Sequence, residues 1–182
     1  MRHFDSIAFA IPLAALLLAG SAPALATDKP TSGGVPVRAQ LVGFQEVPSV
    51  FSEGRGRFFA QIKHDSIEYI LSYEGLLAVL QAHIHLGQRH TNGGVSVFLC
   101  TNLEPPEGAP VPPECPETAG RVTGVLTAAD VVGPEGQGID PGEFKKLVEA
   151  ILAGAAYANV HTDAYRGGEI RGQIKTSRRL HR

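Results

Sequence analysis

Three histidines have the spacing in this 182-residue chain that most favours metal chemistry. Successive side chains of an extended strand point to opposite faces, so His83 and His85 would share one face. About eighty residues later His161 follows Val160, and the same alternation places these two side chains on opposite faces. Neutral imidazoles that converge on one point suit copper or zinc. We therefore expect a metal site formed by His83, His85 and His161, all facing outward from the strands.

Other polar residues are expected on the same face as these histidines. Alternation places Asn159 beside His161, and it places Glu169 and Arg171 together on the last strand. A metal-bound histidine usually donates its second ring nitrogen to a carboxylate or a carbonyl, and Glu169 or Asp163 could accept that hydrogen bond. We expect Asn159, Asp163, Glu169 and Arg171 to form a polar network around the ligands.

Other interpretations of the cluster stay open. Strand histidines often hydrogen-bond to carboxylates and carbonyls with no metal present. His90, on the loop after the first pair, is an extra candidate ligand, whereas His64 is expected to be solvated in a turn. The chain contains no Gly-x-Ser-x-Gly or Cys-x-x-Cys motif. Whether it is an enzyme therefore stays open, and a binding role is favoured over catalysis.

Apolar and polar residues alternate in about eight short segments that are separated by turn residues. This pattern predicts strands at 37–41, 57–63, 67–73, 78–85, 95–99, 121–127, 156–162 and 169–175. The inward set of the histidine strand is expected to be Ala78, Leu80, Ala82 and Ile84. The sequence is typical of a mainly β fold, namely an antiparallel, Greek-key-like β-sandwich of about eight strands with one short α-helix.

The helix is expected after Asp140. Asp140 could cap it, with Pro141 in the first turn and Glu143 three residues after the cap. Gly154 would end the helix. The apolar residues between them have the spacing of one buried stripe, and they are Phe144, Leu147, Val148, Ile151 and Leu152.

Residues 1–26 have the composition of a signal peptide, with a short basic start, an apolar run and a small-residue cleavage site. We expect a flexible leader at 27–36, one domain at 37–176 and a basic tail at 177–182. The apolar run is too short to anchor the chain, and no membrane span is expected in the mature chain. The protein is thus predicted to be exported, either to a periplasm or out of the cell.

Cys100 and Cys115 are the only cysteines of the chain. Two cysteines in an exported protein indicate one disulfide bond, which would tie the base of a proline-rich surface loop at 103–116. The formal net charge is −2, which gives no electrostatic basis for binding nucleic acid.

Four motifs of the chain resemble the CHRD domain, a module first named from chordin and common in exported bacterial proteins. The motifs are Ala39-x-Leu41 with Gly43-Phe44-Gln45-Glu46-Val47-Pro48, Ala82-His83-Ile84-His85-x-Gly87, Gly154-x-x-Tyr157-x-Asn159-Val160-His161-Thr162, and Gly167-Gly168-Glu169-Ile170-Arg171-Gly172-Gln173-Ile174. The resemblance implies a single stand-alone CHRD domain in which the two histidine motifs belong together. It implies little about activity.

The chain is more distantly similar to the copper/zinc superoxide dismutases. Those enzymes place a His-x-His strand on the outside of a Greek-key sandwich, carry a disulfide, and have a Gly-Gly-x-x-x-x-Gly-x-Ile strand that Gly167 to Ile174 matches. Between the first histidine pair and this strand they carry a run of zinc-ligand histidines, where this chain has no such run and only the separate His90 and His161. This departure argues against a dinuclear site and against dismutase activity.

The sequence thus predicts an exported CHRD-domain protein that binds a copper or zinc ion through outward-facing strand histidines. The alternative is a metal-free module that forms a matrix or binds an extracytoplasmic protein. A third interpretation is a redox enzyme that resembles superoxide dismutase.

Overall fold

The computed structural model describes residues 33–105, 107–108 and 110–177. The predicted signal peptide at 1–26 lies outside the described residues, as do most of the leader and of the basic tail. β1 already begins at Val35, so the last two residues of the predicted leader belong to the domain. Within the described residues, no helix is long and apolar enough to cross a bilayer.

Alternating apolar residues form nine strands in the described part of the chain, and every strand pairing is antiparallel. The strands are β1 (Val35–Val42), β2 (Arg55–Ile62), β3 (Ile67–Glu74), β4 (Val79–Leu86), β5 (Val95–Thr101), β6 (Gly120–Leu126), β7 (Ala156–Thr162), β8 (Ile170–Gln173) and β9 (Lys175–Thr176). The predicted range of β7 is confirmed. The predicted last strand is divided at Ile174 into β8 and β9.

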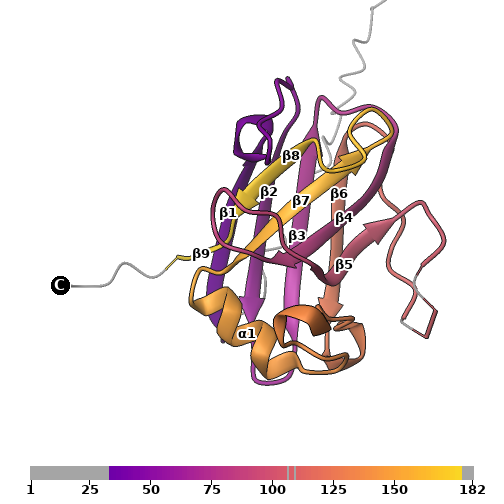
Figure 1. Ribbon diagram of the computed structural model, residues 1–182. Helices are drawn as coiled ribbons and strands as arrows, with labels where there is room; N and C mark the ends of the chain where they lie inside the picture. The colour runs from indigo at the N-terminus through magenta and orange to yellow at the C-terminus, as the bar shows by residue number, and fades with distance from the viewer. Residues whose placement is uncertain (1–32, 106, 109, 178–182) are drawn as a thin grey trace, which may run out of the picture.

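The strands form two layers that are joined into one sheet. The strand order is β5-β4-β7-β8-β1-β2-β3-β6, with β9 paired to β1. Figure 1 shows β4, β5, β7 and β8 in one layer, with β1, β2, β3 and β6 in the layer behind them. β1 connects the layers through the pair Val42 and Arg171 and through its pairing with β9. The predicted antiparallel sandwich is confirmed, except that its layers are hydrogen-bonded into one nearly closed sheet.

The apolar faces of the two layers meet in a single core. Leu41 and Leu71 from one layer and Ile84 and Val160 from the other are completely buried. Burying a side chain of this size stabilises a fold by about 1.5–3 kcal/mol. The core therefore fixes which face of β4 and β7 points inward, and with it the face that carries the histidines.

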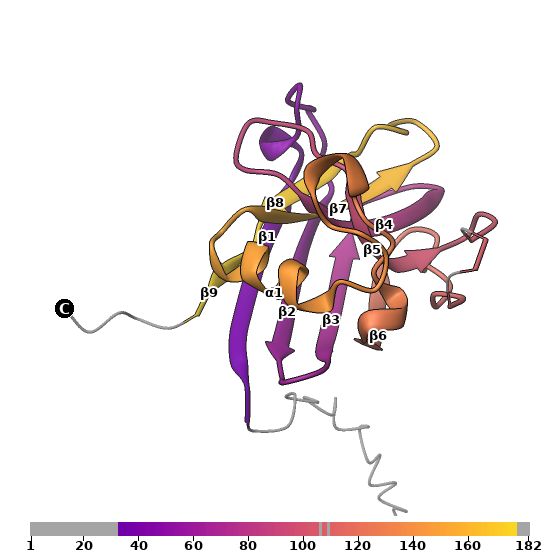
Figure 2. The same cartoon turned by 60° about the horizontal axis from the view of Figure 1, so that its bottom comes forward.

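The α-helix α1 (Phe144–Leu152) packs across one end of this core (Figure 2). Leu147 and Ile151 are buried as predicted, whereas Leu152 at the edge of the stripe is exposed. The helix begins later than the sequence predicts, because Gly142 has a φ of +85° and interrupts the first turn. The Asp140 backbone N–H still donates to the Glu143 carboxylate at 2.8 Å, outside the helix.

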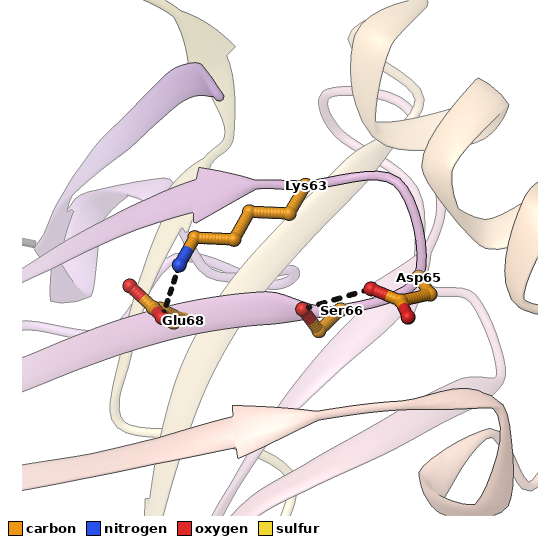
Figure 3. Close-up of polar contacts among 4 residues, drawn as sticks. All are labelled: Lys63, Asp65, Ser66 and Glu68. Atoms are coloured by element: carbon orange, nitrogen blue, oxygen red, sulfur yellow. Dashed lines mark hydrogen bonds and ion pairs between the residues drawn. The ribbon is translucent and has the colours of Figure 1, made fainter. Parts of the chain in front are cut away.

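The predicted hairpin between β2 and β3 is confirmed (Figure 3). The Lys63 backbone N–H donates to the Ser66 carbonyl oxygen at 2.8 Å, which closes the turn. The Lys63 ammonium also forms an ion pair with the Glu68 carboxylate across the hairpin. His64 lies exposed in this turn, as expected for a solvated residue.

The start of β4 departs from the predicted alternation. A register irregularity between Val79 and Gln81 shifts the strand against β7, so Val79 is buried and Leu80 is only partly buried. Ala78 has a φ of +51°, precedes the strand and is exposed. The predicted inward positions of Ala78 and Leu80 are therefore wrong, because an inserted residue reverses the facing of every position before it. The histidines lie after the irregularity and keep their predicted facing.

Cys100 and Cys115 form a disulfide bond at the base of the 103–116 loop. The side chain of Asn102 holds the same loop, because its Nδ2 donates to the Cys115 carbonyl oxygen and its Oδ1 accepts from the Cys115 N–H. The loop is thus tied to β5 by a covalent and a hydrogen-bonded connection.

We predict that replacing both cysteines by alanine lowers the free energy of unfolding by about 3 kcal/mol, the chain-entropy value for a loop of this length. Urea unfolding of the variant and of oxidised wild-type protein measures the difference. Wild-type protein in excess reductant should show a similar loss. A loss below about 1 kcal/mol in both cases would contradict the prediction.

Candidate metal centre

The layer that contains β4, β7 and β8 is buried on both of its faces. All seven residues of β7 are buried. Ala158 and Val160 face the apolar core, so Tyr157, Asn159 and His161 face away from it. The opposite face of this layer therefore forms a second, polar interior.

The histidines lie in that polar interior and not at the surface. His83 is 2 % exposed, and His85 and His161 are each 7 % exposed. The prediction that they face outward is correct only with respect to the apolar core. It is wrong with respect to solvent, because loops cover this side of the sheet.

Loop 87–94, between β4 and β5, folds over this polar face (Figure 1). The side chain of Gln173 donates to the Gly87 carbonyl oxygen at 2.9 Å, and the Arg171 guanidinium donates to the Gln88 carbonyl oxygen at 3.0 Å. These bonds attach the loop to β8. Loop 163–168 closes the other side, where the backbone of Arg166 contacts His161.

The three imidazoles come together as the sequence predicts. The potential ligand atoms of His83, His85 and His161 all lie within 4.8 Å of one another. Nδ1 of His83 is 3.2 Å from Nε2 of His161. Two nitrogens that bind one ion at about 2.0–2.1 Å are at most about 4.2 Å apart. The two most distant ligand atoms therefore need to move only slightly closer together to bind the same ion.

Backbone carbonyl groups fix two of the ring tautomers. Nδ1 of His85 lies 2.9 Å from the Gly93 carbonyl oxygen, and Nδ1 of His161 lies 2.9 Å from the Arg166 carbonyl oxygen. A carbonyl oxygen only accepts hydrogen bonds, so both Nδ1 atoms carry the proton and donate. In the neutral rings each Nε2 atom then carries a lone pair, the form that a metal ion binds, and in the metal-free protein the lone pair of His161 faces Nδ1 of His83.

The histidines are neutral at pH 7 because the site excludes water. Burial, together with the smaller effects of the neighbouring His161 and His85, lowers the pKa of His83 to about 2. Burial likewise lowers the pKa of His85 to about 4 and also lowers the pKa of His161. Nε2 of His83 and Nε2 of His85 are buried without a hydrogen-bond partner.

Tyr157 belongs to the site although the sequence analysis did not single it out. Its ring stacks on His85 with centroids 4.8 Å apart, and the Arg171 guanidinium lies 3.4 Å from the centre of the Tyr157 ring. Because β7 lies between β4 and β8, these two groups approach the ring from opposite sides. The alternation with Asn159 and His161 was the signal that could have identified Tyr157.

The carboxylates proposed as histidine partners lie elsewhere. Glu169 accepts hydrogen bonds of 2.6 Å from the hydroxyl groups of Ser52 and Thr162, and so connects loop 43–54 to β7. Asp163 forms a surface ion pair with Arg166. His90 is exposed on loop 87–94 and is not part of the three-histidine cluster.

Asn159 and Glu46 complete the polar interior. Oδ1 of Asn159 lies 3.1 Å from Nε2 of His161. Glu46 is 6 % exposed, and burial raises the pKa of its carboxyl group to about 7 despite the nearby charge of Arg171. The neighbouring Asn159 side chain lowers the pKa of this carboxyl group to a smaller extent.

These features define a class of protein, an antiparallel β-domain with a buried cluster of three histidines. The chain belongs to the CHRD domain family, whose model matches residues 37–174. The matched range includes both histidine motifs and ends at Ile174, immediately before β9. A search of curated proteins found no match.

We predict that Gly93→Ala disrupts the cover of the site. A Cβ atom at Gly93 would lie 1.6 Å from the Leu86 carbonyl oxygen, so the backbone that holds His85 must move. Loss of this packing should cost at least about 2 kcal/mol of unfolding free energy. Gly167→Ala is the matched control, since a Cβ atom there meets no atom within 4 Å. Equal stability of the two variants in urea would show that loop 87–94 is not closely packed.

We also predict a pH-dependent effect of Glu46→Gln in metal-free protein. The folded-state pKa of Glu46 is raised from 4.5 to about 7, so the fold favours the protonated carboxyl group. Wild-type protein should therefore lose stability relative to the variant as the pH rises from 4.5 to 7, by about 3 kcal/mol. Urea unfolding of both proteins at pH 4 and pH 8 measures this difference. A constant difference would mean that Glu46 ionises normally.

Proposed function

We propose that this CHRD-domain protein is exported and binds one copper or zinc ion through His83, His85 and His161. The observation that carries the proposal is the orientation of the imidazoles. Nε2 of His85 and Nε2 of His161 are held as lone-pair donors by their Nδ1 hydrogen bonds, and both face a shared, water-excluded space with His83.

The cost of burying these nitrogens supports a bound ion. A buried polar group without a hydrogen bond costs about 1–3 kcal/mol, and two ring nitrogens are in this position. In a metal-free structural network, we would expect these nitrogens to have protein partners. A cation bound to Nε2 of His85 would replace the missing hydrogen bond of that atom, and His85 already has the tautomer that this requires.

The donor set favours copper or zinc over calcium or magnesium, since imidazole nitrogen suits the former and the latter take oxygen ligands. The Cys100–Cys115 disulfide fits an oxidising compartment, which supports a periplasmic or secreted location. All three histidines are buried, which disfavours an open redox site of the dismutase type.

The second candidate is a metal-free module that binds another extracytoplasmic protein. The supporting observation is a pair of exposed aromatic rings on loop 43–54. Phe44 is 66 % exposed and Phe51 is 81 % exposed, and their rings pack edge to face at 5.9 Å. Large exposed apolar side chains that lie together are typical of interaction surfaces.

We predict that purified mature protein binds one equivalent of Cu(II) or Zn(II) in calorimetric titrations. His83→Ala/His85→Ala should weaken binding by at least about 100-fold, because two of three ligands are lost. His64→Ala/His90→Ala is the matched control, since both residues are exposed and lie outside the cluster.

Elemental analysis of protein taken from its natural compartment separates the two candidates. The proposed function predicts about one bound metal ion in wild-type protein and none in His83→Ala/His85→Ala. If wild-type protein holds no more metal than that variant, the metal-free module is the better account.

A further inference from the structure

We propose that the side-chain oxygen of Asn159 is a fourth ligand of the ion, and that this oxygen makes the site select Cu(II) and Zn(II) over Cu(I). The inference rests on the proposed function. It concerns a residue whose position on β7, two before His161, places it on the same buried face as the histidines.

The contact between Asn159 and His161 is the first observation. Nδ1 of His161 donates to the Arg166 carbonyl oxygen, so Nε2 of the neutral ring carries a lone pair. This Nε2 atom faces Oδ1 of Asn159 at 3.1 Å. Two acceptors at hydrogen-bond distance repel each other, whereas two ligands of one cation belong at such a distance.

The orientation of the Asn159 amide is the second observation. Its Nδ2 atom, which can only donate hydrogen bonds, lies toward the Glu46 carboxyl group. A Cβ atom added to Gly168 would lie 2.9 Å from Nδ2 of Asn159 and 2.4 Å from Oε1 of Glu46. Both side-chain groups therefore lie next to Gly168 and near each other. With the nitrogen held there, the amide oxygen points to the imidazoles.

The distances also fit adjacent positions on one ion. Nε2 of His161 lies 3.1 Å from Oδ1 of Asn159 and 3.2 Å from Nδ1 of His83. For donor–metal distances of about 2.1 Å, these separations correspond to angles of about 95–100° at the metal. Asn159 is 2 % exposed, so water does not compete for this position from bulk solvent.

An amide oxygen is a harder ligand than imidazole nitrogen. Hard oxygen ligands bind divalent ions better than the soft Cu(I) ion. A site with three imidazoles and one amide oxygen therefore holds Cu(II) and Zn(II) more tightly than three imidazoles alone, with little gain for Cu(I).

The test uses Asn159→Leu, which removes the oxygen and keeps the branched shape of the side chain, and Asn159→Asp, which keeps an oxygen ligand. Affinities for Cu(II), Zn(II) and Cu(I) are measured by chelator competition, and Cu(II) spectra by electron paramagnetic resonance. We expect Asn159→Leu to lose at least about tenfold in affinity for Cu(II) and Zn(II), with a smaller loss for Cu(I). Asn159→Asp should keep tight binding and give a changed Cu(II) spectrum.

The outcomes separate this inference from the proposed function. If wild-type protein and Asn159→Leu bind Cu(II) equally and give the same spectrum, the amide is not a ligand, but the three-histidine site stands. An equal loss for Cu(I) and Cu(II) means a structural role only and also overturns the inference. If Asn159→Leu does not fold, an unchanged Cu(II) spectrum of Asn159→Asp overturns it. Failure of wild-type protein to bind any metal overturns both proposals.

Discussion

Burial of the polar face of the β4-β7-β8 layer is the constraint on which the site depends. One face of this layer packs on the apolar core, so its other face collects every alternate side chain of three strands. Loops 87–94 and 163–168 then exclude water from that face, and each covered polar group needs a partner within the protein. The Gly93 and Arg166 carbonyl oxygens satisfy one nitrogen of His85 and of His161, and leave the other nitrogen of each ring facing the cluster.

The need for loops to cover this polar face also explains residues that take no part in metal binding. Gly93 lies too close to the Leu86 carbonyl oxygen to carry a side chain. Because it has none, loop 87–94 can pack directly against the sheet. Gly172 similarly lies against β1, where a Cβ atom would be 2.2 Å from the Gln40 carbonyl oxygen. The close approach of Gly172 to Gln40 brings β8 next to β1 and so joins the two layers. The site and the closure of the sheet therefore depend on the same strand.

Local patterns predicted the strands, the hairpin at His64, the disulfide and the shared face of the histidines. The disulfide was inferred from the presence of two cysteines in a chain predicted to be exported. The other features follow from alternation and turn residues, which act over a few positions. Burial of His83 and His161 was not predictable in this way, because it depends on loops that are distant in sequence. The partner of Glu169 was missed for the same reason, since Ser52 lies 117 positions away. The irregularity at Val79 left no signal in the apolar pattern, whereas Tyr157 could have been found by continuing the alternation of β7.

The central claim is that the imidazoles of His83, His85 and His161 share one cation through lone pairs fixed by the fold. Long-range proton–nitrogen nuclear magnetic resonance of the histidine rings tests it directly, before and after one equivalent of Zn(II). The account predicts that Nε2 of His85 and Nε2 of His161 are unprotonated in metal-free protein. Zinc should shift the ring signals of all three cluster histidines and leave those of His64 and His90 in place. Protonated Nε2 atoms in the metal-free protein, or cluster signals that zinc does not move, would contradict the account.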